Sequence, residues 1–207
     1  MPAIEDEGVT TERECDQLLV ERVQAGDRQA FDMLVARHQR RLMRLISRIL
    51  RDQNEAEDVV QESFIKAYRG LRHFRGDSAF YTWLYRIGIN TAKNFLLSQG
   101  RRAPLAGEAA LLSAENGEGE HLRDINTPES MLASKQIAAT VNEAMDALPL
   151  ELRTAIVLRE IEGLSYEEIS DIMACPIGTV RSRIFRAREA IAARLRPLLD
   201  KPVDRRW

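Results

Sequence analysis

The segment LSYEEISDIMACPIGTVRSRIFRAREAIAARL, residues 164–195, decides the fold of the C-terminal part of the chain. Ser165 followed by Glu168 is a capping box ahead of an apolar pattern, which predicts the start of a short helix. That helix should end before Pro176, and a long, basic, amphipathic helix follows to about Leu195. A short helix, a tight turn and a basic helix in this order predict a helix-turn-helix.

The second of these helices has the chemistry of a DNA recognition helix. Val180, Ile184 and Ala187 share the face that we expect to be buried. Arginine can make two bonds to guanine, phenylalanine can touch a thymine methyl, and further arginines suit phosphates. The alternative is a solvated, arginine-rich helix end. The predicted contacts to duplex DNA are Arg159, Thr179, Arg181, Ser182, Arg183, Phe185 and Arg186.

A second segment, FRGDSAFYTWLYR at residues 74–86, holds five aromatic side chains in a chain that is only 6% aromatic. Helical phase places Leu84 and Gly88 on a face that can be buried, while Trp83 shares another face with amides and cations. Rings stack on exposed bases, amides read base edges and cations hold phosphates, so this face suits single-stranded nucleic acid. The alternative is ordinary core packing. The candidate contacts are Phe74, Tyr81, Trp83, Tyr85, Arg86, Asn90, Lys93 and Asn94.

A third segment, EAEDVVQESFIKAYRGL at residues 55–71, predicts an acidic, amphipathic helix. Its apolar positions suit a core: Val59, Val60, Phe64 and Ala67. Its polar positions lie elsewhere on the helix: Asp58, Gln61, Glu62 and Lys66. This polar face is either solvated, with support from a Glu62–Lys66 pair, or a docking surface for a basic partner.

The arrangement of charge and composition predicts two domains. The net charge of −2 hides segregated patches, since residues 37–51 carry six arginines and no acid. Residues 103–128 are rich in Gly, Pro, Asn and Ser, with five acids against one base, which is typical of a linker. We therefore predict an all-α protein of two small helical domains joined by a flexible acidic linker. The predicted parts are an extension (1–15), a first domain (16–102), the linker (103–128) and a helix-turn-helix domain (129–207).

Several classes of protein fit the sequence poorly. No apolar run is long enough to span a membrane, and the acidic N-terminus lacks the pattern of a signal peptide, so we predict a cytoplasmic location. Cys15 and Cys175 have no Cys or His neighbours at metal-ligand spacing. We expect no metal site and no cofactor.

Three stretches together carry a resemblance to a known family: EDVVQESFIKAYR, FRGDSAFYTWLYRIGINTAKNFLLSQGRR and LSYEEISDIMACPIGTVRSRIFRAREAI. They resemble the extracytoplasmic-function sigma factors of bacterial RNA polymerase, in particular the envelope-stress sigma-E type. The resemblance extends from about Leu18 to Leu195. It implies transcription initiation at a set of promoters, typically those of a stress regulon, by a protein that is not itself an enzyme.

The resemblance also implies partners. Core RNA polymerase would bind the third segment, which adds Phe64 to Asp58, Gln61, Glu62 and Lys66 as docking residues. The second segment would melt the −10 promoter element and capture a flipped base, and the helix-turn-helix would read the −35 element as duplex DNA. The acidic linker would run toward the polymerase cleft. A membrane-anchored anti-sigma protein could hold the chain at the inner membrane without membrane insertion by the chain itself.

Two other functions are compatible with parts of the sequence. A conventional helix-turn-helix regulator would bind duplex DNA without polymerase, but it gives the face of Trp83, Asn90 and Asn94 no function. A DNA-processing enzyme would need an activated nucleophile or a metal-binding carboxylate cluster. Asp58 and Glu62 lie one helical turn apart, but the sequence offers no further acidic partner for them.

Overall fold

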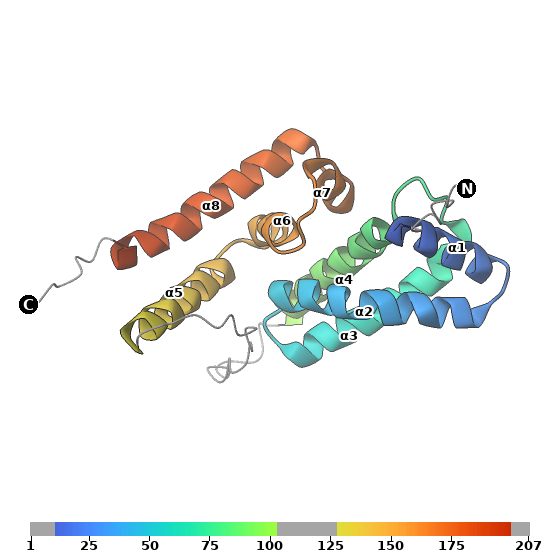
Figure 1. Cartoon of the computed structure of the whole chain (residues 1–207), viewed down its shortest axis with the longest axis horizontal. Helices are drawn as coiled ribbons and strands as arrows, with labels where there is room; N and C mark the ends of the chain where they lie inside the picture. The colour runs from blue at the N-terminus through green and yellow to red at the C-terminus, as the bar shows by residue number, and fades with distance from the viewer. Residues whose placement is uncertain (1–10, 103–127, 200–207) are drawn as a thin grey trace, which may run out of the picture.

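Helices form every regular element in the parts of the chain that this computed structural model describes, residues 11–102 and 128–199 (Figure 1). The predicted all-α class is confirmed. Residues 1–10 of the predicted extension, residues 103–127 of the predicted linker and the C-terminal end of the predicted second domain lie outside the described residues. Residues 11–15 of the predicted extension instead form the N-cap and the start of the first helix.

The N-terminal helices, called here the α1–α4 group, are α1 (Glu12–Gln24), α2 (Arg28–Ile49), α3 (Gln53–Gly70), the 3-10 turn η1 (Leu71–His73) and α4 (Phe80–Arg102). Asp27 and Asp52 accept hydrogen bonds from backbone N–H groups at the starts of α2 and α3. These N-caps satisfy donors that a helix cannot pair internally.

The core of this group fixes the position of α4. One face of α2 is apolar and buried, with Leu42, Leu45, Ile46 and Ile49 at most 2% exposed. A side chain at Gly88 of α4 would place its Cβ 2.8 Å from Cδ1 of Leu42. The close approach of α2 and α4 at this point therefore depends on a glycine.

The C-terminal helices, the α5–α8 group, are α5 (Pro128–Asp146), α6 (Leu150–Glu160), α7 (Tyr166–Met173) and α8 (Ile177–Leu199). The predicted capping box is present, because Ser165 Oγ accepts from Glu168 N at 3.1 Å and Glu168 Oε2 accepts from Ser165 N at 2.8 Å. Ala174 takes a left-handed conformation (φ 50°) in the turn between α7 and α8. The last helix extends beyond the predicted end, through Pro197 to Leu199.

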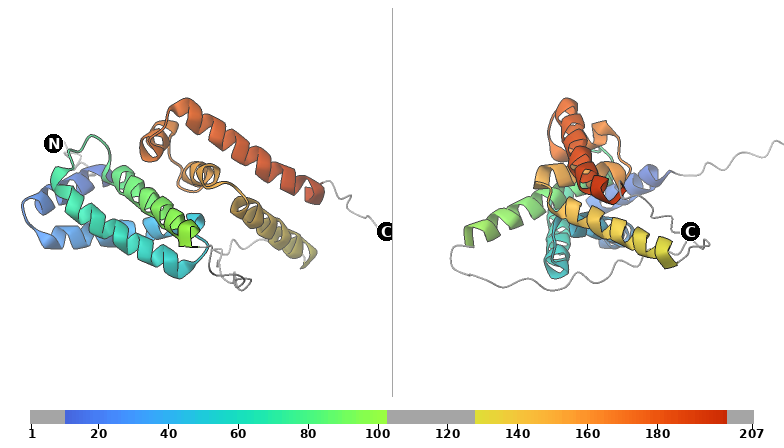
Figure 2. Two further views of the ribbon diagram at one scale, coloured as in Figure 1. Left: turned by 180° about the vertical axis from the view of Figure 1, so that it is seen from behind. Right: turned by 90° about the vertical axis from the view of Figure 1, so that its left-hand side faces the viewer.

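The two groups pack against each other, with α7 beside α4 and α6 beside α2 (Figure 2). Arg153 of α6 holds part of this contact. Its guanidinium donates to the carbonyl oxygens of Ile49 at 3.2 Å, Asp146 at 2.5 Å and Leu148 at 3.2 Å. Three carbonyls at the ends of two different helices thus share one buried cation.

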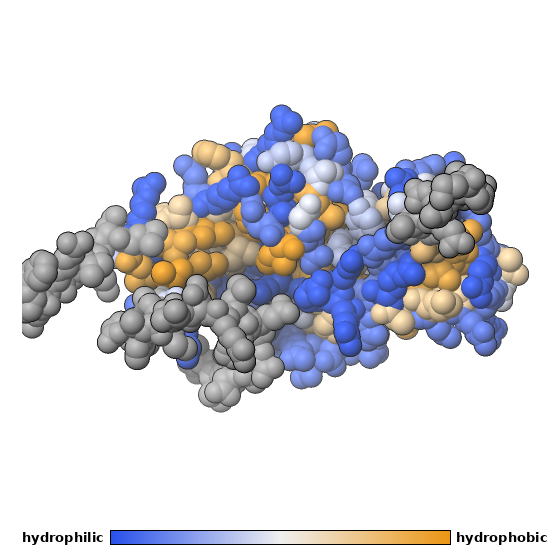
Figure 3. Space-filling view, in the orientation of Figure 1, coloured by the Kyte–Doolittle hydropathy of each residue, from blue (hydrophilic) through white to orange (hydrophobic). Residues whose placement is uncertain are grey.

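None of the described helices is long and apolar enough to cross a membrane. Figure 3 shows hydrophilic side chains over much of one face, with apolar side chains gathered beneath α8 and beside α5. Helix α5 packs against α8 there.

Candidate nucleic-acid interface

The recognition helix presents the face that its sequence predicts. Val180, Ile184 and Ala187 are at most 2% exposed and pack into the core. Phe185, a large apolar side chain, is 60% exposed. Arg181, Ser182 and Arg186 surround it on the exposed side, and Thr179 is half-buried one turn earlier. This face offers cations, a hydroxyl and a ring to a groove.

Two of the predicted DNA-contacting arginines share one aromatic ring. The guanidinium carbon of Arg159, from α6, lies 4.7 Å from the ring centre of Tyr166, and that of Arg181, from α8, lies at 5.5 Å. Arg159 also donates from Nη1 to the carbonyl oxygen of Leu164 at 2.7 Å. Tyr166 was not among the predicted site residues. Its position at the first turn of the short helix was the only sequence signal for it.

Arg183 of α8 and Lys93 of α4 bind the same carboxylate. Glu151, at the start of α6, lies 2.9 Å from Lys93 Nζ and 3.0 Å from Arg183 Nη2. The predicted contacts to single-stranded and duplex DNA are therefore brought together at this point. Arg183 Nη1 also lies 3.3 Å from the Cys175 sulfur.

The long helix α4 carries the predicted single-strand contacts on two different faces. Arg86, Asn90 and Asn94 are exposed, whereas Trp83 is half-buried against Phe74, with ring centres 4.9 Å apart. Trp83 also contacts Phe80 at 5.9 Å, and a Cβ on Gly70 would lie 3.2 Å from the indole. The indole belongs to an aromatic cluster at the edge of the amide face.

Tyr81 and Tyr85 point from α4 toward the α5–α8 group. The Tyr85 hydroxyl donates to Glu162 at 2.9 Å, and the Tyr81 hydroxyl donates to Glu168. Burial raises the pKa of Tyr85, and the negative charge of Glu162 raises it further. Burial and the neighbouring Glu168 likewise raise the pKa of Tyr81. Both phenols therefore stay neutral donors at physiological pH.

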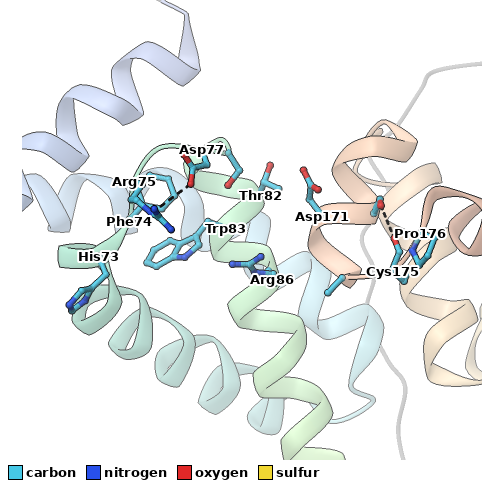
Figure 4. Close-up of a pocket in the computed structure, with 13 residues that line it drawn as sticks. His73, Phe74, Arg75, Asp77, Thr82, Trp83, Arg86, Asp171, Cys175 and Pro176 are labelled. Carbon is cyan, nitrogen blue, oxygen red and sulfur yellow. Dashed lines mark hydrogen bonds and ion pairs between the residues drawn. The ribbon is translucent and has the colours of Figure 1, made fainter.

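The loop before α4 is held at its first residues and turns sharply within. Gln24 Nε2 donates to the carbonyl oxygens of Leu71 and Phe74, both at 2.9 Å. Gly76 has φ +77°, a conformation that suits glycine. A cavity of about 780 Å³ lies between this loop, α4 and the α7–α8 turn. Arg75, Trp83 and Arg86 line one side of it and Asp171 and Pro176 the other (Figure 4).

The third predicted site lies on α3. Its four predicted apolar positions are buried. Glu62 pairs with Lys66 at 2.8 Å, the pair named for a solvated face. Lys66 also donates to Thr91 Oγ1 at 3.2 Å, while Asp58 and Gln61 are exposed. Phe64 is only 7% exposed.

An apolar feature beside these residues was missed from the sequence. Ile65 and Tyr68 are 51% and 43% exposed, and with Phe31 and Phe64 they line a shallow cavity of about 580 Å³. The alternation of apolar and polar positions along α3 could have indicated them, since both lie off the buried face.

Among residues 11–102 and 128–199, no three His, Cys, Asp or Glu side chains gather closely enough to hold a metal ion. The described site offers aromatic rings, amides, hydroxyls and cations. Those groups suit the recognition of nucleic acid by stacking, hydrogen bonding and charge.

Comparison with known proteins places both helix groups in one protein family. Sigma-70 region 2 matches residues 34–102, and sigma-70 region 4 matches residues 138–191. The RNA polymerase sigma-H factor of Pseudomonas aeruginosa is 58% identical over 188 residues, which cover 90% of this chain and 97% of that protein. The ECF RNA polymerase sigma-E factor of Escherichia coli K12 is 55% identical over 192 residues, covering 92% of this chain and 100% of that protein.

A solved structure has a related fold. CnrH, in complex with the cytosolic domain of CnrY, matches with a TM-score of 0.64 and 26% identity, over 88% of this chain and 98% of that one. The same family is indicated by two family matches, by two full-length relatives above 50% identity and by the shared fold. The chain belongs to the sigma-70 family, as an RNA polymerase sigma factor of the extracytoplasmic-function type.

Proposed function

We propose that this sigma factor reads the −35 promoter element with α8, melts the −10 element with α4 and the loop before it, and docks on core RNA polymerase through α3. The observation that carries the proposal is the exposed Phe185 with Arg181, Ser182 and Arg186 around it, on the first turns of a helix that follows a tight turn. Exposing an aromatic ring to water is unfavourable, so an exposed ring indicates a binding surface. In the major groove the ring can contact a thymine methyl, and the donors around it can bind guanine acceptors.

The −10 assignment rests on chemistry rather than on a bound strand. Arg86, Asn90 and Asn94 are exposed along α4, and the aromatic cluster of Phe74, Phe80 and Trp83 ends at the loop with Gly76. Unpairing a base costs a few kcal/mol, and stacking it on a ring returns roughly 1–3 kcal/mol. A loop edged by rings and cations can therefore stabilise an open strand.

The docking assignment for α3 rests on its mixed surface. Asp58 and Gln61 stand exposed close to the apolar side chains Ile65 and Tyr68. Apolar side chains rimmed by polar ones are typical of protein interfaces. Phe64 is part of this surface because it lines the shallow cavity together with Ile65 and Tyr68.

We also propose a cytoplasmic protein whose activity an anti-sigma protein restrains in response to envelope stress. CnrH is similar to this chain and its structure contains the cytosolic domain of CnrY, which supports regulation by such a partner. The 55% identity to sigma-E factors supports the stress assignment.

Transcription in vitro tests the proposal. The reaction contains core RNA polymerase, this chain and promoter templates, and the templates are first selected by binding to the assembled holoenzyme. Promoter-dependent transcripts should form only when all three components are present. The Arg186→Ala chain serves as the matched control, since it should fold but recognise the −35 element less tightly. Duplex binding by the chain alone, with no gain from core polymerase, would instead support a conventional regulator.

A further inference from the structure

Tyr166 joins two candidate DNA contacts that come from different helices. Arg159 lies at the end of α6 and Arg181 in the first turns of α8, and both guanidinium groups approach the same ring, at 4.7 Å and 5.5 Å. A cation near the face of a ring is attracted by its negative charge density. One ring of α7 therefore contacts cations from two different helices.

The ring itself is held by local structure. Tyr166 is the first residue of α7 and lies inside the capping box that Ser165 and Glu168 form. Its side chain is partly buried and packs against the core of the α5–α8 group. The hydrogen bond from Arg159 to the Leu164 carbonyl fixes the same turn from the α6 side. The ring is thus a rigid part of the turn rather than a mobile surface side chain.

We propose that Tyr166 is a positioning residue for −35 recognition, whose ring holds Arg159 and Arg181 in the orientations from which they contact DNA. This inference rests on the proposed function of α8. A guanidinium stacked on a ring keeps its N–H donors free at the edge, where they can bind guanine or phosphate. A free arginine loses up to about 2 kcal/mol of side-chain entropy when it is fixed. Stacking orders both side chains before DNA arrives.

The aromatic ring, not the hydroxyl, carries this role. Tyr166→Phe keeps the ring and should behave like the wild type. Tyr166→Leu keeps an apolar side chain but removes the ring. At about 0.5–1 kcal/mol for each exposed cation–ring contact, the loss of two should weaken binding roughly five- to thirtyfold.

The test measures binding of the holoenzyme to duplexes that carry the selected −35 element and each of its single-base variants. Tyr166→Leu should weaken binding to the selected element and flatten the preference at the base pair that Arg181 reads. In an Arg181→Ala background the same substitution should have a smaller effect, because one of the two stacked partners is already gone. The melting temperature of each variant is measured alongside.

Three results would overturn the inference. Equal defects of Tyr166→Phe and Tyr166→Leu would assign the effect to the hydroxyl. An undiminished effect in the Arg181→Ala background would separate the ring from that arginine. A uniform loss across all duplexes, with a matching fall in melting temperature, would make the role structural. A wild-type holoenzyme that ignores −35 changes altogether would instead refute the proposed function of α8.

Discussion

Tyr85 of α4 donates its hydroxyl to Glu162, just beyond α6, across 2.9 Å. This bond links the two helix groups through side chains that are 77 positions apart. Tyr85 is 2% exposed, so a side chain proposed to work on an open DNA strand is covered in this arrangement. The described structure is therefore a closed form, in which the α5–α8 group covers part of the face that α4 would offer to DNA.

Weakening the contacts between the groups should open this closed form. Glu151→Gln combined with Glu162→Gln removes the charge that Lys93 and Arg183 share and weakens the bond from Tyr85. We expect the free energy that favours the closed form to fall by about 2 kcal/mol, which lowers the closed-to-open ratio roughly thirtyfold. Small-angle X-ray scattering should then give a larger radius of gyration for the variant than for the wild type.

Glu167→Gln, on the exposed side of α7, removes one acid without touching this contact and is the matched control. A double variant that scatters like the wild type, while its secondary structure is intact, would mean that these carboxylates do not hold the groups together.

The buried guanidinium of Arg153 should contribute strongly to stability. Arg153→Met fills similar volume but leaves the carbonyls of Ile49, Asp146 and Leu148 without this donor. Each unsatisfied buried carbonyl is costly, so we expect a loss of about 2 kcal/mol or more in the free energy of unfolding. Urea denaturation followed by circular dichroism measures it, with the exposed Arg194→Met as the control. Equal stability of the two variants would contradict the prediction.

Asn90 allows the −10 assignment to be tested without damage to the core. Asn90→Ala changes an exposed side chain, and we expect it to impair open-complex formation more than polymerase binding. Permanganate footprinting and a polymerase pull-down measure the two separately. Trp83→Ala is less informative, because the indole packs against Phe74 and Phe80 and its removal leaves a cavity that costs about 3–5 kcal/mol.

Gln39→Ala changes an exposed amide on α2 and should leave both readouts unchanged. If Asn90→Ala lowers footprint and pull-down in equal proportion, its amide acts in docking or folding and not on the open strand.

Arg186 is exposed beside Phe185 and should read a base pair of the −35 element. Arg186→Ala is expected to weaken recognition by about 1–3 kcal/mol and to relax the preference at one position. Competition binding of holoenzyme against single-base variants measures this, with Arg194→Ala further along α8 for comparison. A uniform loss over all sequences would make Arg186 a phosphate contact.

The free energy of unfolding should depend on pH through Glu168, which accepts the hydrogen bond from Tyr81 between the two groups. Burial disfavours the charge, but hydrogen bonds from the Tyr81 hydroxyl and from Ser165 outweigh it and lower the pKa of this carboxyl below 4.5. A lowered folded-state pKa means that the carboxylate stabilises the fold above its unfolded-state pKa. This stability is lost as pH falls through the folded-state pKa.

Glu168→Gln can keep the capping hydrogen bonds but cannot titrate. We therefore expect its free energy of unfolding to fall less steeply than that of the wild type between about pH 5 and pH 3. Urea unfolding over this range checks it, with Glu167→Gln as the control. Parallel curves for wild type and Glu168→Gln would remove Glu168 from the acid response.

Local features of the fold were predictable from the sequence because they depend on near neighbours. The capping box at Ser165 and the buried stripe of Val180 and Ile184 each follow from spacing within a few residues. The exposed positions of α4 and α8 followed from helical phase for the same reason.

Contacts between distant segments were not predictable in this way. Buried Asp16 of α1 binds both Arg37 and His38 of α2, each at 2.8 Å, and nothing in the spacing of residues 37–51 indicated a partner on another helix. Tyr85 was predicted to contact an open DNA strand and Arg153 was not singled out, yet both are buried in the structure. Helical phase divides a surface into faces but does not say which face a second domain covers.

The carboxylate of Glu151 also bears on how promoter affinity changes with ionic strength. Opening the closed form separates Lys93 of α4 from Glu151 of α6, whereas the Glu151–Arg183 pair lies within the α5–α8 group. Charges that lose their partner take up counterions from solution. Binding to duplex DNA does the reverse, since each neutralised phosphate releases close to one counterion. If the chain must open before it binds, the uptake of counterions on opening partly cancels their release on binding. Promoter affinity should then vary less with salt than the number of its phosphate-binding arginines implies.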